Sequence, residues 1–304
     1  MSLPDAVTIT DVVLRDGLQD EPVTVATADK LRLLDGLLGA GLRSVEIGAF
    51  VRPDRVPQMA DSDQLFSLAP RRDGVTYSGL VLNARGASRA VAAGVAEARL
   101  VVSASEGHSR ANSGSGVAEV LDSLDEAAAT LAAASPGTAL VGGIATAFVC
   151  PYDGPTPPAR VAAIARRLVA AGARWVSLAD TLGAATPHQV RAGVRAVREA
   201  LPDVPVGLHL HDTHGMALAC AWEALQLGVD RFDAALGGIG GCPFAPGAAG
   251  NAATEDLLGL LHGVGIRTGI DLERLLDLVP LLSELVGHDV DSHQWRARAC
   301  RAPI

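Results

Sequence analysis

The sequence predicts a (β/α)8 barrel, or TIM barrel, with additional helices at its C-terminal end. Eight short runs rich in β-branched residues alternate with longer runs rich in Ala, Leu and Arg, which is typical of repeated βα units. A chain of 304 residues is long enough for eight such units. The main competitor is a Rossmann-like fold, but the turn after the first strand reads LRDGLQDE and lacks the GxGxxG fingerprint. We therefore expect a barrel over 1–270 and a helical extension packed on it over 271–304.

Strands are expected where the apolar runs are short and bounded by polar or glycine residues. In chain order they cover 7–14, 42–47, 75–82, 98–104, 139–148, 174–179, 204–211 and 231–237. Helices are expected in the longer runs near 27–39, 59–69, 85–93, 117–134, 157–171, 187–200, 216–227 and 254–263. No linker divides this series, and the Gly/Ser-rich residues 113–116 are expected to form a loop.

Several predicted helices carry start and stop signals at their ends. Thr27, Thr156 and Thr186 stand at the beginnings of helical runs, where a threonine hydroxyl can accept a hydrogen bond from the first helical turn. Glycines follow the ends of four helical runs, where the backbone often adopts the left-handed conformation that glycine tolerates. These glycines are Gly41, Gly94, Gly172 and Gly228. The signals support the alternation of strands and helices that a barrel requires.

The charge balance argues against nucleic acid or an anionic membrane surface as the main partner. The chain has 25 basic and 34 acidic residues, a formal charge of −9, and no basic block. Lys30 is the only lysine. A phosphate-bearing ligand must therefore be bound by arginines, backbone N–H groups or helix N-termini.

The cysteine spacing and the absence of a long apolar segment are typical of a cytoplasmic protein. The four cysteines are widely separated and lack CxxC spacing, which is not the pattern of a disulfide framework or a structural zinc site. The first strand-like run begins close to Met1, which leaves no room for a signal peptide. No apolar stretch reaches the roughly 20 residues that span a bilayer. We expect no membrane partner.

Polar side chains gather at the ends of the predicted strands. In a (β/α)8 barrel the active site is built at the carboxyl ends of the strands. The residues at or after those ends are, in chain order, Arg15, Asp16, Glu46, Asn83, Ser105, Glu106, Cys150, Tyr152, Asp180, His209, His211, Cys242 and Asn251. Helix capping accounts for one or two of them but not for a whole ring. We therefore expect an active site at this end of the barrel.

Two histidines and an aspartate predict a metal site. His209 and His211 are separated by one residue at the end of the seventh predicted strand, so both point to the same face. Asp16 follows the first strand. In a closed barrel only the eighth strand lies between the first and the seventh, so Asp16 can reach the two histidines. Asn251, in the loop after the eighth strand, can add a carbonyl oxygen. This set suits Mg²⁺ or Mn²⁺, with Co²⁺ or Zn²⁺ as alternatives. The neighbouring His214 lies beside an Asp-Thr helix start, and we expect it to have a structural or ligand-orienting role.

A loop rich in Gly, Ala and Pro covers 237–251 and carries Cys242 near its middle. Glycines permit close approach of the backbone to a ligand, and a cysteine above a charged site is a candidate reactive thiol or general acid/base. Glu46 and Asp180 face the same mouth. Each either orients ligands or water there, or serves as a cap or salt-bridge partner. Cys220 lies on a helical run and is expected to be inert.

Five motifs together carry a family resemblance. They are LRDGLQDE (14–21), VEIGAFVRPDRVPQMAD (45–61), SLADTLG (177–183), HLHDTHGMALA (209–219) and GGIGGCPFAPGAAGNAATEDL (237–257). In this order and spacing they resemble the 3-hydroxy-3-methylglutaryl-CoA (HMG-CoA) lyase family of metal-dependent TIM barrels. The GGCP loop, with an asparagine nine residues after its cysteine, is the most specific of them.

The resemblance implies cleavage of HMG-CoA to acetyl-CoA and acetoacetate, with Mg²⁺ or Mn²⁺ as the cofactor. The family's metal ligands match Asp16, His209, His211 and Asn251. Its catalytic residues match Arg15, Cys242, Glu46 and Asp180, and the candidates for moving protons are Asp16, His209 and Cys242. Asn83 and Ser105 are expected to contact CoA or the acyl group. The resemblance also implies a homodimer or higher homo-oligomer and a role such as leucine degradation.

The sequence departs from the family pattern at several positions. His214 and Phe244 stand where tyrosine is common, Asp20 stands where asparagine is common, and Pro22 replaces a frequent lysine. The loss of that lysine leaves the contacts to the CoA phosphates open. His214 and Phe244 can reshape the acyl pocket, so a related branched 3-hydroxyacyl-CoA is an alternative substrate.

Two other functions are compatible with a barrel of this kind. One is a Claisen-type synthase, similar to isopropylmalate or homocitrate synthase, that condenses acetyl-CoA with a 2-oxoacid. Cys242 and the lack of a large domain after the barrel argue against it. The other is a catalytically inactive binding barrel, which would be expected to have lost a metal ligand or Arg15, and none is lost.

Overall fold

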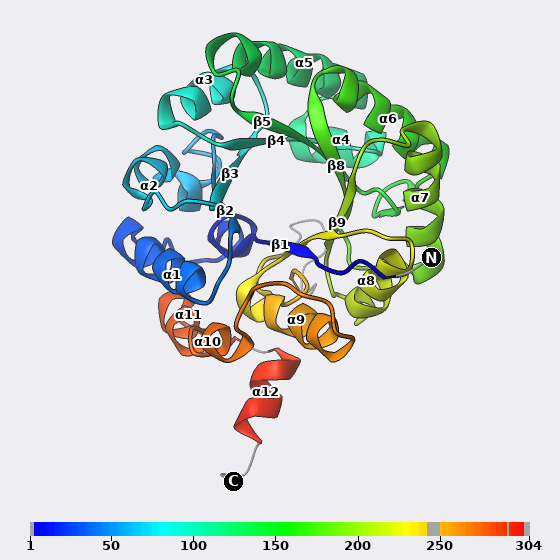
Figure 1. Cartoon of the computed structure of the whole chain (residues 1–304). Helices are drawn as coiled ribbons and strands as arrows, with labels where there is room; N and C mark the ends of the chain where they lie inside the picture. The colour runs from blue at the N-terminus through cyan, green and yellow to red at the C-terminus, as the bar shows by residue number, and fades with distance from the viewer. Residues whose placement is uncertain (1–2, 242–249, 291, 301–304) are drawn as a thin grey trace.

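The computed structural model describes residues 3–241, 250–290 and 292–300, which form a closed barrel of eight parallel strands (Figure 1). Around the barrel the strands follow the order β1, β10, β9, β8, β5, β4, β3, β2. They are β1 (Thr8–Asp11), β2 (Ser44–Ala49), β3 (Thr76–Val81), β4 (Glu97–Ser103), β5 (Ala139–Ala145), β8 (Ala173–Asp180), β9 (Val206–Leu210) and β10 (Arg231–Ala234). The predicted fold class is confirmed.

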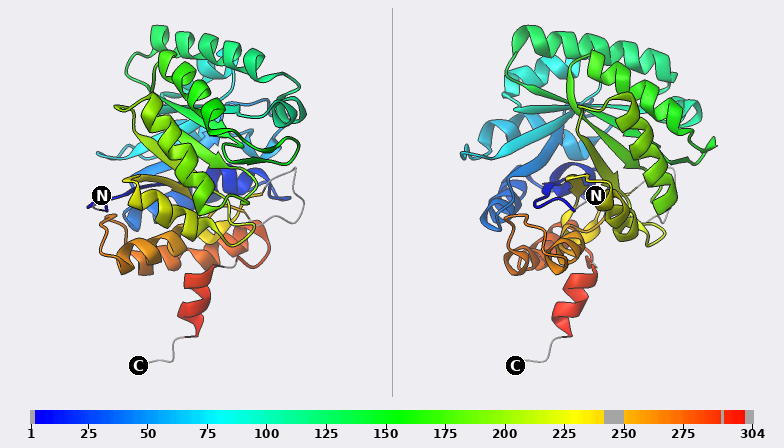
Figure 2. Two further views of the ribbon diagram at one scale, coloured as in Figure 1. Left: turned by 90° about the vertical axis from the view of Figure 1, so that its right-hand side faces the viewer. Right: turned by 45° about the vertical axis from the view of Figure 1, so that its right-hand side comes forward.

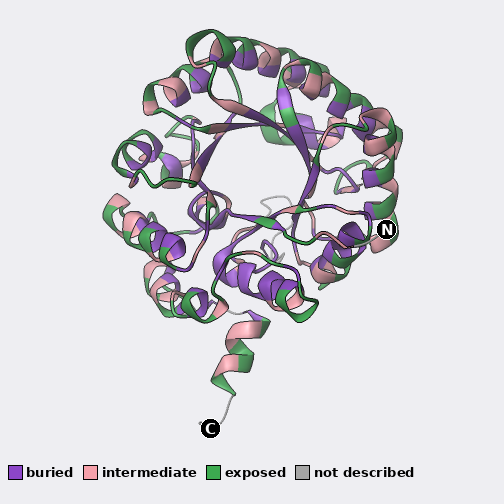
Figure 3. Cartoon of the chain, viewed as in Figure 1, coloured by how far each residue is buried: buried purple, intermediate pink, exposed green. Residues whose placement is uncertain are grey.

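Helices surround the strands, and most bury one face against the barrel (Figure 3). They are α1 (Thr27–Gly39), α2 (Ser62–Leu68), α3 (Ala84–Ala93), α4 (Glu106–Ser113), α5 (Val117–Ala134), α6 (Pro158–Ala170), α7 (Pro187–Ala200), α8 (Ala217–Gln226), α9 (Thr254–Gly263), α10 (Leu272–Leu276), α11 (Val279–Val286) and α12 (His293–Ala299). In α7 the buried positions are Val190, Gly193, Val194 and Val197, which form the stripe expected of a helix packed on a sheet. Among the described residues, no helix combines the length and the apolar character needed to cross a bilayer.

The first strand is shorter than predicted because the chain turns away after Asp11. Residues Val13–Gly17 form a π-helical turn. The buried Asp11 carboxylate stabilises the turn, since its Oδ1 accepts a hydrogen bond from the Val13 N–H at 2.9 Å. π-helical turns are rare and often lie at functional sites. This one carries Arg15 and Asp16 to the mouth of the barrel.

Two short elements differ from the sequence prediction. Helix α4 follows β4, and the antiparallel hairpin of β6 (Val149–Cys150) and β7 (Gly154–Pro155) follows β5. The sequence of α4, EGHSRANS, has no apolar periodicity, so it gives no helical signal. The helix depends instead on its ends: the Ser105 side chain accepts from the His108 N–H at 3.1 Å, and Gly114 ends it with a φ of 77°.

The predicted start signal at Thr186 is confirmed, and those at Thr27 and Thr156 are wrong. The Thr186 hydroxyl accepts a hydrogen bond from the N–H three residues further on. Thr27 is already the first residue of α1, and its hydroxyl donates to Asp61. The Thr156 hydroxyl donates to the Thr146 carbonyl instead of capping α6. The four predicted glycine stops all have positive φ, at Gly41, Gly94, Gly172 and Gly228.

The last helices lie beside the first and ninth helices rather than within the ring of strands. Helices α10 and α11 contact α1, and α12 contacts α9 (Figure 1). The end of α12 extends away from the barrel in each view (Figure 2). Its start is fixed by Asp256, whose carboxylate accepts hydrogen bonds from the N–H groups of His293 and Gln294 at 3.0 and 2.7 Å.

Candidate metal and catalytic site at the carboxyl end of the barrel

Asp16, His209 and His211 converge at the carboxyl ends of β1 and β9. The Nε2 atoms of the two histidines lie 3.1 Å apart. Asp16 Oδ2 lies 3.6 Å from His209 Nε2 and 3.5 Å from His211 Nε2. Side chains alternate along a strand, so the single residue between the histidines puts both imidazoles on the inner face. The structure therefore brings together three of the four residues predicted to hold a metal.

Asn251, the fourth predicted ligand, joins the same cluster from the loop after β10. Its Nδ2 donates to Asp16 Oδ2 at 2.9 Å and to the Ile239 carbonyl at 3.1 Å. Its Oδ1 is buried and has no hydrogen-bond partner among the described residues. Gly240 lies against it with a φ of 123°, and a Cβ there would lie 2.5 Å from Asn251 Nδ2. Glycine is thus required where the loop approaches the asparagine.

These groups fit a divalent cation. Neighbouring ligands of an octahedral ion with bonds of about 2.1 Å lie roughly 3 Å apart, close to the separations of 3.1 to 3.6 Å in the cluster. A buried carbonyl oxygen without a partner is costly in a folded protein, and cation binding would satisfy the Asn251 Oδ1. The carboxylate and amide oxygens of this donor set suit Mg²⁺ or Mn²⁺, whereas the two imidazoles suit Zn²⁺ and other first-row divalent ions equally well.

The electrostatics of the cluster favour an ionised Asp16. Burial alone would raise the pKa of the Asp16 carboxyl, but the neighbouring Arg15 guanidinium and the two imidazoles hold that pKa well below its usual range. The pKa of His209 is raised: burial opposes the charged form, and the carboxylates of Asp233 and Asp16 outweigh it. Metal ligation requires a neutral imidazole, so cation binding and protonation compete at His209.

Arg15 is held at the edge of the cluster by carboxylates on two sides. Its Nε and Nη2 donate to the two oxygens of Glu46 at 2.9 and 3.1 Å, a bidentate geometry that fixes the guanidinium plane. Its Nη1 donates to Asp16. Glu46 is fully buried on β2. Glu46 is therefore the salt-bridge partner of Arg15, which is one of the two roles left open by the sequence, and a catalytic role for Glu46 stays a prediction.

Two buried charged residues that the sequence analysis missed complete the site. Arg99 on β4 donates through Nη1 to Asp233 Oδ2 on β10 at 2.6 Å. Asp233 Oδ2 also lies 3.4 Å from His209 Nδ1. Burial alone would raise the pKa of Asp233, but the neighbouring Arg99 and His209 lower that pKa to about 2. The available signal was that each of two short strand-like runs, EARLVVS and RFDA, carries a second charged residue two positions after the one at its start.

Asp180 lies at the end of β8 but uses its carboxylate to hold the following turn. It accepts hydrogen bonds from the N–H groups of Ala184 and Ala185 at 3.2 and 2.9 Å. Burial raises the pKa of this carboxyl, which these N–H groups partly offset. This is the capping alternative, and a catalytic role for Asp180 stays a prediction.

Asn83 and Ser105, predicted to contact CoA or the acyl group, cap helices. Asn83 Oδ1 accepts from the Gly86 N–H at 2.9 Å at the start of α3. The buried Ser105 hydroxyl donates to Asp153 at 2.7 Å and lies 2.7 Å from Cys150 Sγ. Both residues follow strand ends at the mouth of the barrel, so a contact with the substrate stays a prediction. The Ser105 hydroxyl already has hydrogen-bond partners within the protein.

The predicted cysteine Cys242 and the neighbouring Phe244 lie outside the described residues. His214 is exposed in the turn before α8. The start of that helix is stabilised by Asp212, whose Oδ1 accepts from the Ala217 N–H at 2.8 Å, as expected of helix-start residues. Cys220 is buried on α8, and burial raises the pKa of its thiol to about 12, which agrees with the predicted inert role.

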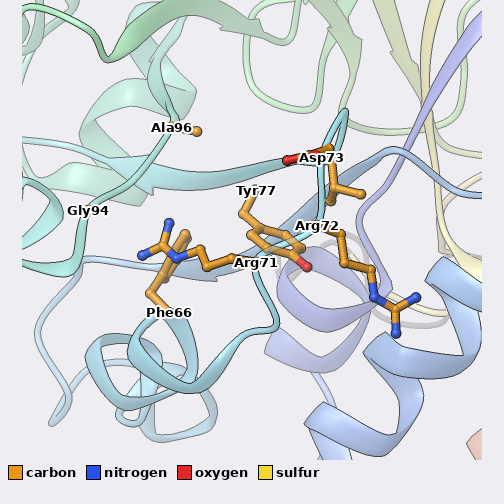
Figure 4. Close-up of a pocket in the computed structure, with 8 residues that line it drawn as sticks. Phe66, Arg71, Arg72, Asp73, Tyr77, Gly94 and Ala96 are labelled. Atoms are coloured by element: carbon orange, nitrogen blue, oxygen red, sulfur yellow. The ribbon is translucent and has the colours of Figure 1, made fainter.

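A small cavity at the opposite end of the barrel lacks the features of a catalytic site (Figure 4). It has a volume of about 130 Å³ and is lined by residues that include Phe66, Arg71, Arg72 and Tyr77. Tyr77 lies near the start of β3, whereas the metal ligands lie beyond strand ends. Two of the polar side chains that line the cavity are engaged elsewhere: the Tyr77 hydroxyl donates to the Pro70 carbonyl, and Arg72 pairs with Asp35.

Comparison with known proteins places the chain in one family. The HMGL-like family model matches residues 6–282. The chain is 46% identical to (R)-citramalyl-CoA lyase of Chloroflexus aurantiacus over 93% of this chain and 92% of that protein. It is 40% identical to the 3-hydroxy-3-isohexenylglutaryl-CoA/hydroxymethylglutaryl-CoA lyase of Pseudomonas aeruginosa over 99% of this chain and 100% of that protein.

The barrel also matches solved structures over its whole length. An HMG-CoA lyase from Acinetobacter baumannii, in complex with coenzyme A and 3-methylmalate, superposes with a TM-score of 0.92 at 38% identity, covering 100% of this chain and 99% of that one. The named relatives are lyases rather than synthases, which agrees with the first of the functions considered. The chain therefore belongs to the HMGL-like family and is an enzyme of the carbon–carbon lyase class.

Proposed function

We propose that this lyase, using a divalent cation, cleaves a CoA thioester whose acyl group carries a tertiary 3-hydroxyl and a terminal carboxylate. The observation that carries the proposal is the cluster of Asp16, His209 and His211, with the Arg15 guanidinium beside it. HMG-CoA is the first candidate substrate, with acetyl-CoA and acetoacetate as products. Mg²⁺ or Mn²⁺ is the proposed ion.

Citramalyl-CoA is a second candidate, favoured by the 46% identical relative that is named for it. It differs from HMG-CoA by one methylene between the tertiary carbon and the carboxylate, and its cleavage would give acetyl-CoA and pyruvate. A single methylene contributes only about 1–3 kcal/mol to discrimination in a pocket. The same catalytic groups can therefore serve either substrate, and the residues around the carboxylate decide between them.

In the proposed reaction the C2–C3 bond breaks and its electron pair moves into the thioester. The proton of the tertiary hydroxyl must leave, and C2 must gain a proton to give acetyl-CoA. When bound, the divalent ion acts as a Lewis acid for the substrate oxygens. The proposed role of Arg15 is to stabilise the negative charge that develops on the thioester oxygen, and the bidentate contact with Glu46, which fixes the guanidinium, supports this role. Preorganised charge of this kind costs no rearrangement during the reaction.

Three groups are the candidates for moving the two protons. They are Asp16 and His209, which belong to the metal cluster, and Cys242, which lies outside the described residues. Asp16 is suited to accept a proton only transiently, because Arg15 and the imidazoles favour its ionised form.

The CoA phosphates are proposed to be bound without lysine. Lys30, the only lysine of the chain, is buried, and its Nζ donates to Asp61 at 2.6 Å and to the Gln58 carbonyl at 2.7 Å. It is therefore committed to holding α1 to the segment after β2. Arginine side chains and backbone N–H groups are the available donors.

The test is a product analysis with a panel of thioesters. The purified enzyme, stripped with EDTA and supplied with Mn²⁺ or Mg²⁺, is incubated with HMG-CoA, with each enantiomer of citramalyl-CoA and with a longer branched analogue. Acetoacetate, pyruvate and acetyl-CoA are quantified. Acetyl-CoA with one matching oxo acid identifies the substrate. Absence of cleavage across the panel, or full turnover in excess EDTA, would contradict the proposal.

A further inference from the structure

Buried charged side chains form a closed chain of contacts inside the barrel, from the metal cluster to Arg15 and back. In order around the ring they are Asp16, Arg15, Glu46, Arg99, Asp233 and His209. Acidic and basic groups alternate along it, and the ring contains one more carboxylate than guanidinium group. Arg99 and Asp233 are the two members to which neither the motifs nor the proposed mechanism assign a role.

Arg99 reaches across the barrel interior. Passing from β4 to β3, β2, β1 and β10 crosses half of the closed ring of strands, so Arg99 and Asp233 start from opposite sides (Figure 1). Their side chains nevertheless meet at 2.6 Å. Arg99 Nε also lies 3.9 Å from Glu46 Oε2, and its guanidinium lies 5.4 Å from the ring of Trp175. One side chain thus contacts the partners of both Arg15 and His209.

Asp233 faces the nitrogen of His209 that the metal cluster does not use. Its Oδ2 lies 3.4 Å from Nδ1, while Nε2 points toward His211 and Asp16. A carboxylate beside Nδ1 favours the tautomer with a proton there and leaves the Nε2 lone pair free. Metal-ligating histidines are commonly oriented by such a carboxylate, which fixes the ring and strengthens it as a ligand.

Stability alone does not account for Arg99 at this place. Its Nε and Nη2 form no hydrogen bond with any described residue, although the side chain is buried. Buried ion pairs are often replaced by apolar side chains without loss of stability. A buried arginine with two nitrogens that form no hydrogen bond is better explained by the carboxylates that it holds in position.

We propose that Arg99 and Asp233 are positioning residues: Asp233 orients His209 toward the divalent cation, and Arg99 anchors Asp233 and Glu46 from across the barrel. The proposal rests on the metal site of the proposed function. Arg99 thereby couples the metal-binding half of the site to the half that holds Arg15. Neither residue touches the substrate.

The test measures cation affinity directly, without a substrate. EDTA-stripped protein is titrated with Mn²⁺, and the free ion is followed by electron paramagnetic resonance, with the folded fraction checked by circular dichroism. Asp233→Asn and Arg99→Met are expected to raise the Mn²⁺ dissociation constant about 10- to 100-fold. Arg99→Lys keeps the charge but cannot reach both carboxylates, so it should restore affinity in part.

Two variants serve as matched controls. Glu97→Gln removes the other carboxylate beside Arg99, 3.7 Å from its Nε, which lies outside the ring. Arg191→Met breaks the pair with the buried Glu223 on the outer helices. Both should leave the Mn²⁺ dissociation constant within about twofold of the wild-type value, whatever they do to the melting temperature.

Each outcome decides between the alternatives. If folded Asp233→Asn binds Mn²⁺ as tightly as the wild type, the positioning role is wrong. If the single variants do not fold, the charge-balanced double variant Arg99→Met/Asp233→Asn is measured, and unchanged affinity again overturns the proposal. A wild-type protein that binds no Mn²⁺ would instead contradict the proposed function and, with it, the role of these two residues.

Discussion

Replacement of Arg15 by methionine tests the electrostatic part of the site most severely. The arginine side chain is 11% exposed and donates to both oxygens of Glu46 and to Asp16. Methionine fills similar space but supplies no charge and no donor. The fully buried Glu46 would then have Arg99 as its nearest cation, at 3.9 Å.

Two separate losses are expected from this one change. Breaking a buried pair leaves an uncompensated charge, which costs about 3–5 kcal/mol of unfolding free energy. Loss of one preorganised group that stabilises a developing oxyanion lowers kcat by about 10²- to 10³-fold. Urea denaturation measures the first loss, and acetyl-CoA release under saturating substrate and Mn²⁺ measures the second.

The double variant Arg15→Met/Glu46→Gln separates the two losses. It removes the unpaired carboxylate, so most of the lost unfolding free energy should return, while kcat should stay low. A double variant whose kcat returns to within about tenfold of the wild type would refute the reasoning. Arg15 would then act only as the counter-charge of Glu46.

Three further predictions concern the metal cluster and its surroundings. Asn251→Ala removes the unpartnered Oδ1 and should weaken Mn²⁺ binding about tenfold or more in the titration described above, and an unchanged dissociation constant would exclude Asn251 as a ligand. Gly240→Ala brings a Cβ to 2.5 Å from Asn251 Nδ2 at a φ of 123°, so it should lower the unfolding free energy measured by urea denaturation by about 1–3 kcal/mol. Gly137→Ala is the control, because nothing lies within 4 Å of the added Cβ, and it should leave the unfolding free energy unchanged. Burial raises the pKa of Glu255 from 4.5 to about 7, so the folded protein binds this proton more tightly than the unfolded chain and loses stability as the pH rises through that range. Glu255→Gln should therefore gain up to about 3 kcal/mol relative to the wild type between pH 4.5 and pH 8, and a constant difference would contradict the raised pKa.

The ends of the strands were the most predictable part of the molecule. Parallel strands in a closed barrel bring their carboxyl ends to one mouth, so a polar residue at each end predicts a site before any side chain is placed. His209 and His211 are two residues apart on a strand, so the sequence also predicted that their side chains point to the same face. For this reason Asp16, His209, His211 and Asn251 could be grouped from sequence, and the structure has them within contact distance.

The sequence did not reveal contacts that form only when the strands close into a barrel. Arg99 and Asp233 are far apart in the chain and start on opposite sides of the barrel, so only the closed ring of strands shows that they meet. Asn83 and Ser105 look like ligands and like helix caps equally well, because both roles favour a small polar residue after a strand. The π-helical turn at Val13–Gly17 depends on a carboxylate two residues earlier, which strand propensity does not register.

The most direct test of the site is anomalous diffraction from crystals grown with Mn²⁺. We expect one strong manganese peak about 2.0–2.4 Å from Asp16 Oδ2, the Nε2 atoms of His209 and His211, and Asn251 Oδ1. His209 Nδ1 should remain within hydrogen-bond distance of Asp233. A peak at another place, or no peak beside the two histidines at saturating Mn²⁺, would contradict the assignment of this cluster as the metal centre.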